Sequence, residues 1–149
     1  MDDITIAPPR ASDKADWRRL YEGYATFYKM PMTDAVADRV WSWLHDKDHV
    51  LEALVARDGA GRVVGLAHFR AMPRPLTGTT AAFLDDLFVV PSLRGKGVGE
   101  LLIKAMAEEC RRRGWTIIRW LTADDNYRAR GLYDQVAKRT MWITYQLDL

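Results

Sequence analysis

A glycine-rich segment between an apolar strand-like run and an amphipathic helix constrains this chain more than any other feature. The segment reads Arg94-Gly95-Lys96-Gly97-Val98-Gly99, and the apolar run before it ends at Val90-Pro91. A strand that turns through glycines into a helix leaves several backbone N–H groups unpaired, all directed at one point. Because the helix macrodipole is already positive there, Arg94 and Lys96 indicate an anionic ligand such as a phosphate. A solvent-exposed turn with two surface cations is the alternative.

Length and charge exclude several classes of protein. The chain has 149 residues, 48% hydrophobic and 28% charged, which predicts one globular domain spanning residues 1–149. A net charge of +2 is small for a nucleic-acid-binding protein. The only basic run, Arg111-Arg112-Arg113, precedes Gly114, where cations and glycine suit a helix end. We therefore expect no nucleic-acid partner.

The sequence also gives expectations about location, redox chemistry and metals. The N-terminus lacks the layout of a signal peptide, and no apolar run approaches the roughly 18 residues that span a bilayer. We therefore expect a cytoplasmic protein without a membrane partner. The single cysteine, Cys110, lies within a helical pattern and has no internal disulfide partner. His45, His49 and His68 show no metal-ligand spacing, so we expect no metal.

The apolar pattern predicts alternating strands and helices. Strands are expected at residues 4–7, 51–57, 62–72, 82–90, 115–122 and 140–147. Helices are expected after residue 12, from Thr33, from Val98 to Gly114, and after Asn126. The order βααβββαβαβ combines an antiparallel hairpin with one crossover unit. It predicts an α/β fold with a mixed central sheet flanked by helices.

Spacing distinguishes three kinds of phosphate-binding loop. The nucleotide-triphosphate loop needs Gly-Lys followed by Ser or Thr, which is absent from this chain. The dinucleotide fingerprint needs a third glycine at position 100, where Glu100 stands. The pattern that remains is R-x-x-G-x-G, preceded by Leu84-Asp85-Asp86-Leu87-Phe88-Val89-Val90-Pro91.

This arrangement resembles the acetyl-coenzyme-A loop of the GCN5-related N-acetyltransferase (GNAT) superfamily. The second half of the family signature, Asn-x-x-Ala-x-x-Leu-Tyr, is present as Asn126-Tyr127-Arg128-Ala129-Arg130-Gly131-Leu132-Tyr133. Residues 83–89 and 122–126 are similar to those of diamine and polyamine acetyltransferases and of small enzymes that resemble histone acetyltransferases. That branch often has Gly-Phe shortly after the tyrosine, whereas this chain has Val136-Ala137-Lys138-Arg139.

The resemblance implies a site for acetyl-coenzyme A as co-substrate. The backbone of the loop would hold the pyrophosphate, and glycines would let it approach without a Cβ in the way. The preceding strand would offer backbone groups to the pantetheine arm, which requires the neighbouring strand to diverge. Asn126 would bind pantetheine or cap the following helix. The cofactor-binding residues implied are Leu87, Phe88, Val89, Arg94, Gly95, Lys96, Gly97, Val98, Gly99, Glu100, Asn126 and Ala129.

The resemblance also assigns two catalytic roles. An amine must lose a proton before it attacks a thioester, and Asp85 is the candidate base, directly or through water. Because strand residues alternate between faces, we expect Asp85 and Asp86 to point in opposite directions. Tyr133 occupies the family's position for the acid that protonates the leaving thiolate. Capping or packing roles are the alternatives for Asp85 and Tyr133.

The acceptor implied is a primary amine, a small cationic amine or a polyamine. Tyr24, Phe27 and Tyr28 would line its pocket together with Asp85, through cation–π contacts, although the three aromatic residues suit a core equally well. A protein lysine or N-terminal amine is the alternative acceptor. A non-catalytic acyl-coenzyme-A-binding module, or a loop for another phosphate ligand, is the alternative function. We expect a homodimer from the resemblance alone.

Overall fold

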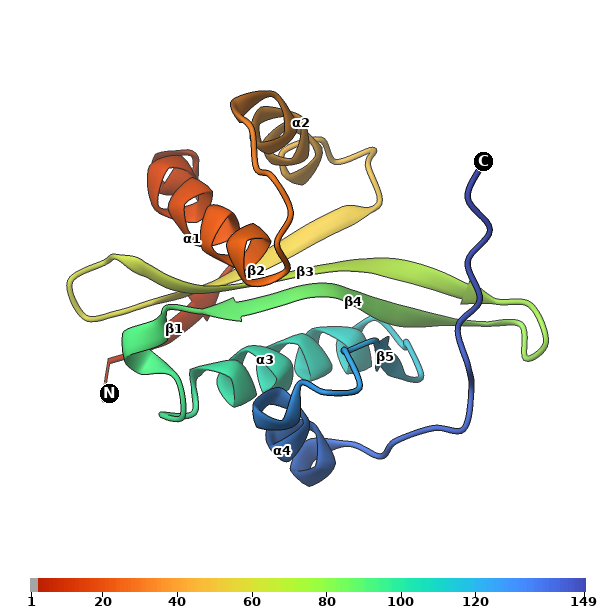
Figure 1. Ribbon diagram of the computed structural model, residues 1–149. Helices are drawn as coiled ribbons and strands as arrows, with labels where there is room; N and C mark the ends of the chain where they lie inside the picture. Colours follow the sequence, from red (N-terminus) through yellow and green to blue (C-terminus); the bar gives the residue numbers. More distant parts are fainter. Residues whose placement is uncertain (1–2) are drawn as a thin grey trace.

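A mixed β-sheet lies between two layers of helices in the computed structural model, which describes residues 3–149 (Figure 1). Helices α1 and α2 cover one face of the sheet, and α3 and α4 lie on the other. The strands are β1 (Thr5–Ala7), β2 (Leu51–Arg57), β3 (Val63–Arg74), β4 (Thr79–Val89) and β5 (Ile118–Trp120). The helices are α1 (Lys14–Phe27), α2 (Asp34–Leu44), α3 (Val98–Arg112) and α4 (Tyr127–Val136), with short 3₁₀ turns at Ala11–Asp13 and Pro91–Leu93.

The strand order in the sheet follows the order in the chain, β1-β2-β3-β4-β5. The first four strands are antiparallel, whereas β4 and β5 run parallel. The β4–β5 pairing ends at Leu84↔Trp120, but β4 stays paired with β3 as far as Val89. Among residues 3–149, therefore, no strand lies beside the outer edge of β4 from Asp85 onward.

A β-bulge interrupts β4 at Asp85. His68 of β3 pairs with Asp86, and the next β3 residue, Phe69, pairs with Leu84. Asp85 is thus an extra residue opposite a continuous β3, so the alternation of side chains changes phase there.

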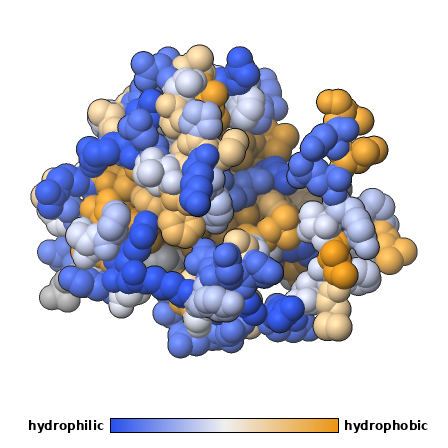
Figure 2. Space-filling model, viewed as in Figure 1, coloured by the Kyte–Doolittle hydropathy of each residue, from blue (hydrophilic) through white to orange (hydrophobic). Residues whose placement is uncertain are grey.

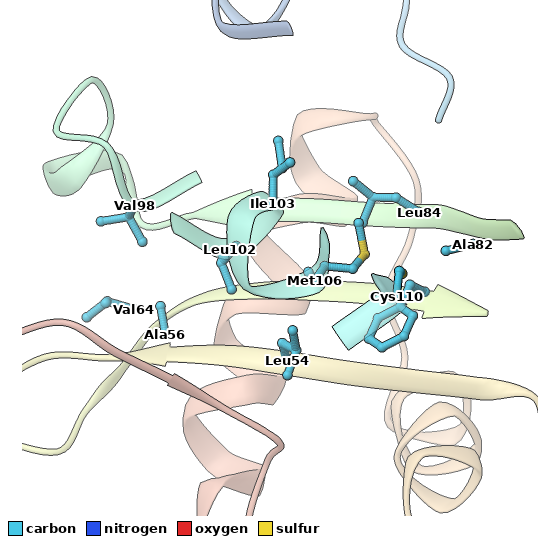
Figure 3. Packing of buried hydrophobic residues seen from close by; sticks show 12 residues of the cluster. Leu54, Ala56, Val64, Ala82, Leu84, Val98, Leu102, Ile103, Met106 and Cys110 are labelled. Atoms are coloured by element: carbon cyan, nitrogen blue, oxygen red, sulfur yellow. The ribbon is translucent and has the colours of Figure 1, made fainter. Parts of the chain in front are cut away.

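Two apolar clusters hold the helices against the sheet. On the α3 face, Leu102, Met106 and Cys110 point from the helix toward the strands, where Leu54 and Leu84 lie (Figure 3). On the other face, Trp17 and Leu20 of α1 pack with Val40 of α2 and with Leu66 and Phe88 of the sheet. These two layers fix the ends of α1 and α3 relative to β4.

The α/β class, the mixed sheet and the flanking helices predicted from the pattern are confirmed, but the last strand is wrong. Residues 140–147 form no strand, and the chain after α4 is extended and exposed. Figure 1 shows this tail with its C-terminus apart from the labelled helices and strands. We define residues 137–149 as the C-terminal tail.

Candidate active site

A cleft of about 430 Å³ opens where the unpaired edge of β4 meets the glycine loop. Helix α4 forms one wall, and the C-terminal end of α1 forms another. The predicted residues that line it are Tyr24, Phe27, Tyr28, Leu87, Phe88, Val89, Arg94, Gly95, Gly97, Val98, Gly99, Glu100, Asn126, Ala129 and Tyr133. The fold therefore brings together residues from four separate parts of the chain.

The glycine loop presents backbone amides to this cleft. Gly95 and Gly97 have φ angles of 77° and 88°, which residues with a Cβ rarely adopt. Gly97 is the N-cap of α3 and has no side chain to occupy the helix amides. The first intrahelical bond runs from Leu101 N to Gly97 O, at 3.0 Å. The amides of the first turn thus precede any helical acceptor and suit an anion.

The unpaired edge of β4 leads directly into that loop. Leu87, Phe88 and Val89 line the cleft beyond the point where β5 ends. The guanidinium of Arg94 spans the end of this edge: its Nε donates to Val89 O at 3.4 Å, and its Cζ lies 5.1 Å from the Phe88 ring centroid. The sequence reasoning expected the neighbouring strand to diverge here; in the structure β5 ends at Trp120, and its pairing with β4 ends there.

Helix α4 places a cap and a hydroxyl in the cleft. Asn126 is the N-cap, and its Oδ1 accepts from the Ala129 amide at 3.4 Å. Tyr133 packs edge-on against Trp120 of β5, with ring centroids 5.3 Å apart. Burial raises the pKa of Tyr133 to about 12, with a smaller contribution from Tyr28. The phenol is therefore protonated at neutral pH and has a proton to donate.

The two aspartates of β4 lie on the same face, contrary to the expected alternation. Asp85 accepts from Arg70 Nε at 3.0 Å, and Asp86 accepts from the Tyr21 hydroxyl of α1 at 3.2 Å. Arg70 and His68, two residues apart on β3, share the face that α1 covers. The bulge causes this, because the extra residue turns Asp85 toward α1.

Asp85 and Asp86 nevertheless differ in environment. Burial raises the pKa of Asp85, and Arg70 opposes that rise only in part. Burial also acts to raise the pKa of Asp86, but hydrogen bonds from His68 and from tyrosines 21 and 24 outweigh it, so this pKa lies below its ordinary value. The Asp85 carboxylate does not line the cleft, but its carbonyl oxygen lies 3.4 Å from the hydroxyl of cleft-lining Tyr24.

The residues that line the cleft differ from the predicted set at a few positions. The Lys96 amide donates to Leu93 O at 3.3 Å, and Lys96 lines a separate hollow together with Asp58 and Arg62. Lys96 therefore does not face the cleft. The cleft residues that the sequence reasoning missed are Leu93, Arg128, Leu132 and Gln135.

A signal for Arg128 was present in the sequence. Arg128 stands in the first turn of α4, where the helix dipole makes a cation unfavourable. Arg94 lies in a comparable position, shortly before the start of α3. A Cβ built on Gly95 would lie 3.8 Å from an Arg128 guanidinium nitrogen, so this cation stands beside the loop.

Two other findings concern the described residues. Within residues 3–149 no group of three or more His, Cys, Asp or Glu side chains is arranged to hold a metal ion. No helix in the same range is long and apolar enough to cross a bilayer.

Comparison with known proteins identifies the family to which a chain with this fold and cleft belongs. The model of the acetyltransferase (GNAT) family matches residues 17–137. The D-amino-acid N-acetyltransferase of Saccharomyces cerevisiae is 28% identical over 146 residues, which cover 97% of this chain and 91% of the yeast protein. A thialysine N-epsilon-acetyltransferase of Caenorhabditis elegans is 33% identical over 70 residues, 44% of each chain.

Solved structures agree with the family match. The ribosomal-protein-alanine N-acetyltransferase from Brucella melitensis biovar Abortus 2308 has a TM-score of 0.80 and 29% identity, covering 98% of this chain and 99% of its own. The aminoglycoside N-acetyltransferase AAC(6')-Iy, solved with coenzyme A, shares the fold with a TM-score of 0.84 at 19% identity, over 97% of this chain and 94% of its own. The chain belongs to the acetyltransferase (GNAT) family and is an acetyltransferase whose co-substrate is acetyl-coenzyme A.

Proposed function

We propose that this enzyme transfers an acetyl group from acetyl-coenzyme A to the amine of a small molecule. The observation that carries the proposal is the continuity of the cleft. The open edge of β4 runs into the amides of the glycine loop, with the Tyr133 hydroxyl on the facing helix. We also propose that residues 1–149 act as one catalytic unit. The cytoplasmic location and the homodimer stay predictions.

The glycine loop is the proposed pyrophosphate site. The amides of Val98, Gly99 and Glu100 would donate to phosphate oxygens, because no helical turn precedes them. Arg94 and Arg128 would add charge, since both line the cleft. The pantetheine arm would lie along Leu87, Phe88 and Val89 in place of a strand. This places the thioester toward the Asp85 end of β4.

Asp85 is the proposed base. Its raised pKa suits a proton acceptor better than the lowered pKa of Asp86, whose Oδ2 is bound by both His68 and Tyr21. The Asp85 carboxylate does not line the cleft, which supports proton transfer through water rather than direct contact. The ammonium of the acceptor would release its proton along this route and become a nucleophilic amine.

Tyr133 is the proposed acid. The amine nitrogen bonds to the thioester carbonyl carbon, and the tetrahedral intermediate then collapses as the C–S bond breaks. The Tyr133 hydroxyl gives its proton to the departing sulfur. The nitrogen loses its second proton as the amide forms, and that proton returns through water to the phenolate. The products are an amide, coenzyme A with a free thiol, and the proton that the amine gave up.

The wall formed by α1 is the proposed acceptor site. Tyr24 and Tyr28 have ring centroids 4.9 Å apart, and Phe27 lies edge-on to Tyr28 at 5.1 Å. All three line the cleft, and Phe27 and Tyr28 are exposed. Their ring faces would hold an ammonium group by cation–π attraction.

A free amino acid is a second candidate acceptor, favoured by Arg70. The Arg70–Asp85 ion pair is partly exposed on the α1 face of the sheet. An amino acid carries an ammonium and a carboxylate, which complement Asp85 and Arg70 in turn. The similarity to a D-amino-acid N-acetyltransferase over nearly the whole chain supports this candidate.

A panel of acceptors tests these proposals. Purified protein is incubated with acetyl-coenzyme A and polyamines, L- and D-amino acids, a peptide with an N-terminal alanine, or a peptide with an internal lysine. Release of free thiol is followed, and acetyl-coenzyme-A binding is measured separately by calorimetry. We expect turnover on a small amine or an amino acid.

Each result decides between the candidates. Turnover restricted to the peptides would favour a protein acceptor and overturn the small-molecule proposal. Binding of acetyl-coenzyme A without thiol release on any amine would indicate a module that has lost its chemistry. Failure to bind acetyl-coenzyme A would remove the loop as its site.

A further inference from the structure

Three side chains form a row across the sheet just beyond the Asp85 end of the cleft. Phe83 of β4 pairs with Arg70 of β3 on one side and with Arg119 of β5 on the other. Residues that pair across neighbouring strands lie side by side on the same face of a sheet. We name Arg70, Phe83 and Arg119 the arginine row. None of the three lines the cleft itself.

The arginine row lies on the α1 face of the sheet, as Asp85 does. Ile118 and Trp120, which flank Arg119 in β5, both pack against the core cluster of the α3 face. Because successive strand residues point to opposite faces, Arg119 lies on the α1 face. At the other end of the row, the ion pair between Arg70 and Asp85 joins it to the proposed base.

The arginine row is partly open to solvent. Each of its three residues is half-buried, and the Arg70 side chain is 41% exposed. Figure 1 shows β3 and β4 continuing past α1 toward the turn that joins them. Figure 2 shows hydrophobic groups at the surface along the middle of the molecule, with hydrophilic side chains above and below. A small ligand that leaves the cleft at Asp85 therefore meets this part of the sheet next.

The charges of the arginine row do not balance. Arg70 is paired with Asp85 at 3.0 Å, whereas Arg119 has no acidic partner within residues 3–149. The neighbouring Asp86 is held by the buried imidazole of His68. The row and Asp85 together thus carry one positive charge in excess, which a single carboxylate would neutralise.

Phe83 supplies an apolar floor between the two guanidinium groups. The Arg70 Cζ lies 4.7 Å from the Phe83 ring centroid, so this guanidinium already lies over the ring. The backbones of the two arginines flank β4 and are about 10 Å apart at the ordinary spacing of strands. Both long side chains reach a carboxylate held above the ring between them. The floor keeps water from one side of that carboxylate and strengthens its contacts with the guanidinium groups.

The arginine row begins where the proposed cofactor site ends. The pantetheine arm would lie along residues 87–89, with the thioester toward Asp85. Phe83 lies two residues farther along β4, which is about 7 Å. The hydroxyl of Tyr24, on the acceptor wall of the cleft, lies 3.4 Å from the Asp85 carbonyl oxygen. An acceptor held by the α1 wall therefore has its other end beside the row.

We propose that Arg119 selects acceptors that carry a carboxylate, by binding this carboxylate together with Arg70 while the amine of the acceptor lies on the Asp85 side. The inference rests on the proposed transfer to small-molecule amines and narrows the acceptor to amino acids and other amino carboxylates. Arg119 contributes more to the selection than Arg70, because the Arg70 guanidinium is shared with Asp85.

A purely structural role for Arg119 makes a different prediction. β5 is the last strand of the sheet, and a cation on an edge strand discourages two sheets from joining edge to edge. In that role Arg119 affects solubility and treats every acceptor alike. The two roles are separated by acceptors that differ only in the carboxylate.

The first experiment measures thiol release on matched acceptors. Alanine, phenylalanine and lysine, in L and D forms, are each compared with their amide and their decarboxylated amine. We expect a higher kcat/KM on the amino acid than on its amide. Arg119→Gln should raise the KM for the amino acid about tenfold or more, as expected for one lost charge-assisted contact, with little change in kcat. The KM values for the amide and the amine should stay unchanged.

Two further variants control for charge and position. Arg119→Lys keeps the cation and should retain part of the preference for the carboxylate. Arg74→Gln removes a cation that lies four residues beyond Arg70 on β3, about 13 Å along the strand, and should leave every KM unchanged. Circular dichroism verifies that each variant is folded. Equal rises in KM for the amino acid and its amide in Arg119→Gln, or a wild type indifferent to the carboxylate, would overturn the proposal.

A second experiment measures binding without turnover. N-acetylphenylalanine and N-acetylphenylalaninamide are titrated by calorimetry into protein saturated with coenzyme A, which keeps the carboxylate out of the glycine loop. We expect wild type to bind the carboxylate form at least about tenfold more tightly, and Arg119→Gln to lose this preference.

The two measurements distinguish failure of this inference from failure of the proposed function. Turnover of small amines without a carboxylate preference would overturn the role of Arg119 and leave the proposed function intact. A carboxylate preference in binding that depends on Arg119, without turnover of any small amine, would support the carboxylate site and contradict the proposed function. Equal binding of the two N-acetyl compounds to wild type would contradict the carboxylate site.

Discussion

The imidazole of His68 joins Asp86 to Trp17 in the interior of the protein. Its Nδ1 lies 2.8 Å from Asp86 Oδ2, and its Nε2 accepts from the Trp17 indole N–H at 2.9 Å. The indole nitrogen can only donate, so the accepting ring nitrogen carries no proton and the other one donates to the carboxylate. His68 is completely buried. The hydrogen bonds from Trp17 through His68 to Asp86 fix Asp86 beneath α1, next to the proposed base.

His68→Leu should destabilise the fold by about 2 to 3 kcal/mol, because it leaves the Trp17 indole and the Asp86 carboxylate without a partner. Urea unfolding followed by fluorescence measures the change. His45→Leu is the control, since His45 is exposed and contacts only its own helix end; its effect should stay within about 0.5 kcal/mol. Equal losses in the two variants would contradict the importance of the buried chain.

Tyr133→Phe should lower kcat by about 100-fold, because general acid catalysis contributes at least this much and the phenyl ring keeps the packing. The affinity for acetyl-coenzyme A, measured by calorimetry, should change little. Tyr127→Phe removes a hydroxyl from the same helix outside the cleft and should leave kcat unchanged. An unaltered kcat in Tyr133→Phe at every pH tested would assign the proton donor elsewhere.

Gly97→Val should weaken acetyl-coenzyme-A binding by roughly 100-fold or more, the equivalent of two lost charge-assisted hydrogen bonds. A Cβ at a φ of 88° strains the loop and displaces its amides. Gly114→Val is a matched control, because Gly114 has a φ of 76° and open space around it but lies at the far end of α3. Both variants should lose similar thermal stability, and only Gly97→Val should lose binding.

Arg128→Gln should raise the KM for acetyl-coenzyme A about tenfold, as expected for one lost charge-assisted contact. Acetyl-pantetheine, which has no phosphate, should show no difference between the variant and the wild type. Arg111→Gln, in the last turn of α3, controls for the loss of a surface charge. If Arg128→Gln raises the KM for both substrates by the same factor, Arg128 does not bind the phosphates.

Arg70→Gln should move the acidic limb of the kcat/KM profile to higher pH. Burial raises the pKa of Asp85, and Arg70 opposes this by favouring the charged carboxylate. Without Arg70 the carboxylate holds its proton to a higher pH, so the deprotonated base appears later as pH rises. Arg70→Lys keeps the charge and should shift the limb less. The assay uses an amine without a carboxylate, and a limb that stays in place would exclude Asp85 as the base.

Much of the site could be predicted from the chain because it depends on local rules. Positive φ at Gly95 and Gly97 follows from a strand that must turn into a helix within a few residues. Asn126 was identifiable as a cap, and its side chain accepts from Ala129 as expected. Helix caps and glycine turns are set by neighbouring residues, so their geometry is predictable from composition and order.

The features that the sequence missed depend on distant parts of the chain. The bulge at Asp85 exists because β3 has no extra residue opposite it. It depends on the pairing of the two strands, and the sequence of β4 alone does not predict it. Lys96 lines a different hollow from the cleft, together with Asp58 from the loop between β2 and β3. The tail at 140–147 has the alternation of a strand, yet a strand forms only beside a partner edge. Alternation predicts which residues suit a strand but not where the partner lies.

The unequal length of β4 and β5 has a consequence for turnover. Since no strand of the described part of the chain pairs with the outer edge of β4 beyond Leu84, we expect the bound pantetheine arm to act as a temporary strand along that edge. Release of the spent coenzyme A would then break its backbone hydrogen bonds to β4 one after another, rather than in a single step. The length of this free edge would then set how long the spent coenzyme A stays bound after the amide has formed.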